Sequence, residues 1–162
     1  MKKYAIPVII STLVLGSLLS VLAETNTKFS SKFIKNFRDC DSYEETITST
    51  FENQTFTTNR KIVGWHNGSC RYEETITSPK DKYKLSCDFN GIQVDELYDA
   101  MKSKSRTPEK YELEIYALQT DPKTGRSSYS VVGTQTIKGN KAYITWAKIQ
   151  NNPYFCTSKK LQ

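Results

Sequence analysis

Residues 61–78 read KIVGWHNGSCRYEETITS, and this stretch decides the fold. Its centre is Asn67-Gly68, the dipeptide that best tolerates the two positive φ angles of a type I′ hairpin turn. Polar and apolar residues alternate on both sides of the turn, which is typical of two paired strands. The predicted pairs are His66 with Ser69, Trp65 with Cys70, Val63 with Tyr72 and Lys61 with Glu74. One face of this hairpin should therefore collect Val63, Trp65, Cys70 and Tyr72.

The heptapeptide YEETITS occurs twice, at residues 43–49 and again at 72–78. We expect the two copies to be the first and third strands of a meander, with residues 56–66 as the strand between them. If the Tyr and Ile side chains of both copies share a face, the loop around 52–55 holds an odd number of residues or a strand carries a bulge. The reason is that a slip of one residue reverses every side chain.

Helical patterns precede and follow this meander. Three phenylalanines and an isoleucine at helical spacing predict a short amphipathic helix over residues 28–38. Asn90, with Gln93 three residues on, forms a capping box that begins a second helix, which ends near Met101. Four further strands are expected at 83–89, 111–118, 128–137 and 142–149. The predicted class is α+β, with two short helices packed on antiparallel β-meander sheets in the order helix, four strands, helix, three strands.

The first 23 residues predict a cleaved signal peptide. Lys2 and Lys3 precede an apolar run over 6–22, and Ala23 ends a sequence that fits signal-peptidase cleavage. A retained membrane anchor is the alternative, because the run is nearly long enough to span a bilayer. Cleavage leaves no stable membrane span. The expected parts are the signal 1–23 and a single domain 24–162, with possible sub-halves 24–101 and 110–162 joined by the polar linker 102–109.

The chain has four cysteines, Cys40, Cys70, Cys87 and Cys156. An even count without close spacing, in an exported chain, favours two disulfides over a metal site. We expect Cys70 to pair with Cys87 on adjacent strands, which leaves Cys40 for Cys156. A turn at Ser78-Pro79-Lys80-Asp81 would however place Cys87 opposite Tyr72, which puts this pair in doubt. Four cysteines allow three connectivities. The expected location is periplasmic or extracellular.

Charge indicates where an anionic partner would bind. Cleavage removes two lysines and no acid, so the net charge of +6 falls to +4, and nucleic acid is not an expected partner. Residues 121–162 hold seven of the basic residues against the single Asp121. Cations interleaved with aromatics suit an anionic polymer, although a strand would send the two aromatics to opposite faces and one into the core. The candidate surface is Lys138, Lys141, Tyr143, Trp146 and Lys148.

The sequence contains no recognised catalytic, metal or phosphate-loop motif, and we expect neither enzyme activity nor a cofactor. The leading interpretation is an exported, monomeric binding module whose partner is an envelope protein or an anionic envelope polymer. A second hypothesis is a hydrolase or lyase that uses Glu45, Glu74 and His66, the only histidine. A salt-bridged sheet surface around Lys61 explains the same carboxylates. A third is a structural subunit of a surface assembly.

Overall fold

The computed structural model describes residues 29–51, 53–103 and 107–161, so the predicted signal peptide lies outside the described residues. The first half contains α2 (Ser31–Asp39), β1 (Tyr43–Phe51), β2 (Gln54–His66), β3 (Ser69–Thr77), β4 (Lys82–Phe89) and α3 (Gly91–Lys102). The second half contains β5 (Glu109–Thr120), β6 (Ser127–Gly139), α4 (Lys141–Gln150) and β7 (Cys156–Lys160).

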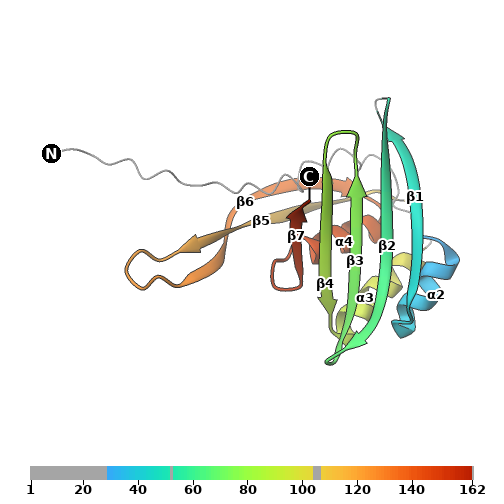
Figure 1. The fold of residues 1–162 in the computed structure, drawn as a ribbon, viewed down its shortest axis with the longest axis horizontal. Helices are drawn as coiled ribbons and strands as arrows, with labels where there is room; N and C mark the ends of the chain where they lie inside the picture. Colours follow the sequence, from blue (N-terminus) through green and yellow to red (C-terminus); the bar gives the residue numbers. More distant parts are fainter. Residues whose placement is uncertain (1–28, 52, 104–106, 162) are drawn as a thin grey trace.

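The main sheet is antiparallel, with strand order β1-β2-β3-β4-β7, and helices α2, α3 and α4 lie against one of its faces (Figure 1). Strands β5 and β6 form a separate two-stranded sheet that projects away from this body. The α+β class is confirmed, and so is the four-strand meander that follows the first helix. The observed order is helix, four strands, helix, two strands, helix, strand.

The predicted strand at 142–149 is wrong, because these residues form helix α4. The side chain of Asn140 caps this helix by accepting a hydrogen bond from the Tyr143 N–H at 2.9 Å. Periodicity misled here because α4 packs on two sides at once. Trp146 and Ile149 enter the main core, whereas Tyr143, Ile144 and Ala147 pack against β5 and β6. A short segment that is apolar all round has no period that separates helix from strand. The last strand is instead β7, which pairs with β4.

Trp146 organises the main core. The centroid of its ring lies 5.1 Å from the ring centroid of Phe29, 5.4 Å from that of Phe37 and 5.2 Å from that of Tyr72. Trp146 follows the polar stretch 102–109, whereas these three partners precede it, so the main core is built from both sides of that stretch. A second, smaller cluster around Leu113 and Ile137 lies wholly after it.

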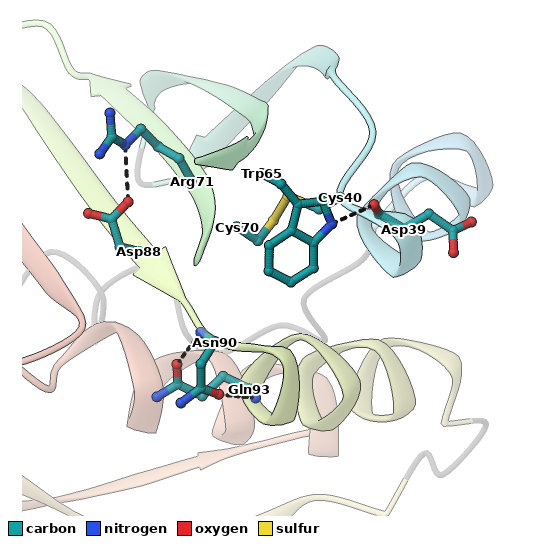
Figure 2. The surroundings of a disulfide bond; sticks show 8 residues. All are labelled: Asp39, Cys40, Trp65, Cys70, Arg71, Asp88, Asn90 and Gln93. Carbon is teal, nitrogen blue, oxygen red and sulfur yellow. Dashed lines mark hydrogen bonds and ion pairs between the residues drawn. A yellow bond between two sulfur atoms is a disulfide. The ribbon is translucent and has the colours of Figure 1, made fainter. Parts of the chain in front are cut away.

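The start of the second helix is confirmed as a capping box (Figure 2). The Asn90 side chain accepts from the Gln93 N–H at 3.0 Å, and the Gln93 side chain accepts from the Asn90 N–H at 2.9 Å. The pair satisfies two backbone donors that a helix end leaves unpaired. Helix α3 therefore begins where the sequence predicts it.

The Asn67-Gly68 turn is confirmed, and so are the two pairs nearest to it. The predicted pairs farther from the turn are wrong by one residue, because the register shifts between Ile62 and Gly64. Gly64 has a φ of +123°, which a β-branched or other side-chain-bearing residue rarely adopts. The resulting bulge puts Ile62 opposite Tyr72 and leaves Val63 40% exposed.

Lys61 consequently lies opposite Glu73 rather than Glu74. Trp65 does not join the predicted apolar face either. It is 50% exposed, and its indole N–H donates to the Asp39 carbonyl at 3.0 Å (Figure 2). The indole thus ties the turn end of β2 to the end of α2.

All four cysteines form disulfides, as predicted, but the predicted pairing is wrong. The bonds join Cys40 to Cys70, with Cα atoms 5.8 Å apart, and Cys87 to Cys156, with Cα atoms 4.1 Å apart. Cys87 lies opposite Tyr72 on β3 and opposite Cys156 on β7, so β7 supplies the partner that β3 cannot. Cys40 caps α2 and reaches the hairpin from there (Figure 2).

Two disulfides indicate an oxidising, extracytoplasmic compartment. Within the described ranges, none of the helices has the length and apolar character needed to cross a bilayer.

Candidate functional site

The two YEETITS copies flank β2 in the same register. Tyr43 and Tyr72 both lie opposite Ile62, and the second glutamate of each copy lies opposite Arg60. The connection from β1 to β2 has two residues, an even number, so the bulge at Val63 restores a common face. The expected condition for a shared face is therefore met by the bulge and not by the loop.

The charged residues of this face form the Glu45–Arg60–Glu74 cluster. The Arg60 and Glu45 side chains are only 12% and 10% exposed, and the Arg60 Nη1 lies 3.8 Å from the Glu45 Oε1. Glu74 is 8% exposed and lies opposite Arg60. Burying an ionised side chain without a partner costs a free energy on the order of several kcal/mol. The Arg60 guanidinium supplies such a partner for Glu45, and Glu74 lies opposite the same residue on the next strand.

The N-terminal end of the described chain covers this cluster. The Phe29 ring lies 4.5 Å from the Arg60 guanidinium carbon, and the Ser30 hydroxyl donates to Glu45. Ser30 is also the N-cap of α2, since its side chain accepts from the Phe33 N–H at 3.0 Å. The start of α2 therefore covers these charged side chains, and we interpret the cluster as structural.

Glu74 receives two side-chain donors, the Tyr72 hydroxyl at 2.6 Å and the Gln150 amide at 3.3 Å. Burial, and then the neighbouring Glu74 carboxylate, raise the pKa of Tyr72 well above its ordinary value. Tyr72 therefore stays a neutral donor throughout the physiological range. It is suited to holding a carboxylate in place.

His66 does not join the two carboxylates. It is the last residue of β2, is exposed, and lies six residues along the strand from Arg60, roughly 20 Å at the strand rise. The hydrolase hypothesis requires one cleft that holds His66, Glu45 and Glu74. The described residues do not provide that cleft.

The candidate basic surface is divided between core and solvent. Tyr143 and Trp146 are 6% and 3% exposed, so neither ring can stack on a ligand. Lys138, Lys141 and Lys148 are exposed, and the Lys148 ammonium pairs with Glu96 at 3.5 Å. The structure therefore brings the lysines to the surface without their aromatic partners. Within the described residues, no group of three His, Cys, Asp or Glu side chains is placed to hold a metal ion.

The two-stranded sheet β5–β6, which we call the arm, has two different parts. Near the body, Leu113 and Ile137 are buried against α4. Farther out, two cross-strand pairs, Tyr116 with Val131 and Leu118 with Tyr129, lie on one face of the hairpin. Leu118 is 59% exposed, Val131 49% and Tyr129 36%. We call these four residues the apolar face of the arm.

Sequence reasoning predicted the two strands of the arm but missed this face. The alternation of apolar residues over 111–118 was visible, as was the Tyr129 and Val131 pair. Alternation indicates which side chains share a face, but it does not tell whether another element covers that face. The missing information is that α4 packs on the face that holds Leu113, whereas Tyr116 and Leu118 have the opposite parity on β5 and lie on the other face.

Comparisons with protein-family models, with curated proteins and with solved structures found no match to this chain.

Proposed function

We propose that this chain is an exported, non-catalytic binding module, periplasmic or extracellular, that engages a protein partner through the apolar face of the arm. The observation that supports this most directly is the pair of apolar cross-strand contacts on the arm, in which Leu118, Tyr129 and Val131 are exposed. A two-stranded hairpin is marginally stable alone, and contiguous exposed apolar side chains on a small domain mark interaction surfaces. A partner that covers this face would stabilise the hairpin and remove its apolar side chains from water.

The chemistry of the face favours a protein over an anionic polymer. Its side chains are two tyrosines, a leucine and a valine, with no cation among them. Tyr154 extends the surface, since its ring meets that of Tyr129 edge-on at 6.0 Å and is 68% exposed. Aromatic and aliphatic residues enriched at the centre of a patch are typical of protein interfaces, whereas anionic polymers require cations.

Site-specific photocrosslinking in the producing cells tests this proposal. A photoreactive phenylalanine analogue replaces Leu118 in one variant and Gln119 in another. Adjacent strand residues point to opposite faces, so the two probes differ only in the face that they report. We expect a discrete heterologous adduct from position 118 and none from 119. Equal labelling from both positions, or none from either, argues against the arm as the docking surface.

The structural-subunit alternative uses the same face, because two arms could cover each other. It predicts that the adduct contains only this chain and that the sedimentation coefficient of the purified protein rises with concentration. The proposed module instead sediments as a monomer across the concentration range. Export has its own measurement: the N-terminus of the protein recovered outside the cytoplasm should be Glu24.

A further inference from the structure

A cleft of about 390 Å³ lies between helices α2 and α3. The two helices lie side by side at one end of the molecule, on the side of the body away from the arm (Figure 1). Side chains from the whole length of α2 and from the last turns of α3 line the cleft. They are Ser31, Ile34, Lys35, Arg38, Asp39, Tyr98 and Lys102. The cleft takes no part in the apolar face of the arm.

Cations converge on one aromatic ring in this cleft. The Arg38 guanidinium carbon lies 5.7 Å from the centroid of Tyr98, and the Lys102 ammonium lies 5.0 Å from it. Lys35 lines the same space, one turn from Arg38 on α2. With Asp39 as the single acid of the lining, the walls carry three positive charges against one negative charge, a net of +2.

These three cations differ from those on the outer face of the sheet. There, Lys61, Arg71 and Lys84 each meet a carboxylate within 4.0 Å. Within the described part of the chain, no Asp or Glu oxygen lies within that distance of the cleft cations. Like charges held together without a counter-charge repel each other, and an anion relieves that repulsion.

We propose that this cleft binds a small organic phosphomonoester. Such a group carries a charge near −2 at neutral pH and presents three strong acceptor oxygens, which matches the net charge of the lining. The Arg38 fork and the two ammonium groups donate to these oxygens. The Ser31 hydroxyl offers a neutral donor at the other end of the cleft. The volume exceeds what a bare phosphate needs, and Ile34 and Tyr98 supply apolar contact for the organic part.

The helix dipole offers another explanation for the positions of two of the three cations. Arg38 and Lys102 lie in the last turns of α2 and α3, where a positive charge stabilises the helix dipole. That explanation predicts an effect on stability and none on phosphate binding. The experiment therefore measures both quantities.

The test is an NMR titration of the full exported chain with phenyl phosphate at pH 7.5, with inorganic phosphate as the second probe. We expect saturable amide shifts centred on Arg38, Tyr98 and Lys102, with tighter binding of phenyl phosphate than of inorganic phosphate. The variant Lys35→Gln/Arg38→Gln/Lys102→Gln should weaken binding by at least about tenfold, the loss expected from one charge-assisted hydrogen bond. Thermal unfolding of the same variant reports the contribution of the cations to helix stability.

A control of equal charge is Lys80→Gln/Lys82→Gln/Lys159→Gln, whose residues lie at the far edge of the sheet, and it should bind phenyl phosphate like the wild type. A second readout is pH, because below about pH 6 the ligand becomes a monoanion and its affinity should fall several-fold. Equal losses in the two triple variants, shifts that never saturate, or equal affinity for both probes would overturn the proposal. None of these outcomes bears on the arm, so the two proposals fail separately.

Discussion

Tyr72 shows at the residue scale how a single hydroxyl connects the core to a buried charge. Its ring packs against Trp146, and its hydroxyl donates to Glu74 at 2.6 Å. Burial and the carboxylate both resist ionisation, so the pKa of Tyr72 is higher in the folded chain than in the unfolded chain. The stabilisation from this difference is complete below the unfolded pKa of about 10 and is lost as the pH rises above it.

The variant Tyr72→Phe tests this linkage. At neutral pH the lost donor should lower the free energy of unfolding by about 1.5–3 kcal/mol, the range for a hydrogen bond to a charged group. The decline of stability between about pH 10 and 11 should be shallower than in the wild type. Urea unfolding at a series of pH values measures both effects. Tyr154→Phe, at an exposed position, serves as the control; a wild-type slope in Tyr72→Phe would contradict the assignment.

Arg60 carries the second residue-scale prediction. Replacing it with methionine leaves the Glu45 carboxylate without its cation and removes the positive charge opposite Glu74, and breaking a buried ion pair typically costs about 3–5 kcal/mol. The neighbouring Lys61 is 46% exposed in its side chain and pairs with Glu44 at 3.8 Å. Lys61→Met should therefore cost less than about 1 kcal/mol. Chemical unfolding measures the free energy of unfolding of both variants. Similar losses in the two would mean that the Glu45–Arg60–Glu74 cluster does not stabilise the protein more than an exposed ion pair does.

At the scale of elements, the junction between β6 and α4 is tightly packed. A Cβ on Gly139 would fall onto the ring of Tyr143, 2.9 Å from its Cγ. Tyr143 is buried and follows the Asn140 cap, so its ring has little room to move. Gly139 is thus required by a close approach and not by its backbone angles.

We expect Gly139→Ala to destabilise the protein by roughly 1–3 kcal/mol, as overpacking does. Gly133 lies on the same strand, and a Cβ there would meet nothing within 4 Å. Gly133→Ala should therefore be neutral or stabilising by up to about 1 kcal/mol. Thermal unfolding compares the two alanine variants directly. Equal melting temperatures would show that the Tyr143 ring moves aside at little cost.

At the scale of the whole molecule, the disulfides join segments that are distant in the sequence. The Cys87–Cys156 bond spans 69 residues and fastens the final strand, whereas the Cys40–Cys70 bond spans 30 and fastens α2 to the hairpin. Both loops are long enough that the chain-entropy model assigns each bond about 4 kcal/mol.

Peptide mapping without reduction should recover these two links and no Cys70 to Cys87 link. Removing either pair by double substitution with alanine should lower the free energy of unfolding by about 2–5 kcal/mol. A mapped Cys70 to Cys87 bond would contradict the sheet register, because Cys70 lies opposite Phe89 and not Cys87. Unfolding of the two double variants, measured side by side, gives the contribution of each bond.

Local chemistry alone determined the meander, the Asn67-Gly68 turn, the capping box at Asn90, and the presence of cysteines that pair. Each of these depends on residues that are near one another in the chain, where propensity and turn geometry act directly. A shared face for the two YEETITS copies also requires a bulge or an odd loop. The sequence does not determine which of the two occurs, because either one satisfies the same alternation.

Tertiary structure decided the rest. The sequence did not reveal helix α4 at 142–149, because most of its residues are buried on two sides and little of the period that distinguishes helix from strand is left. The disulfide partners depended on β7, which lies beside β4 only after the chain has folded back. The apolar face of the arm and the cleft between α2 and α3 depend on what covers each surface. Which surfaces other elements cover depends on how the whole molecule packs, and a local sequence pattern does not contain that information.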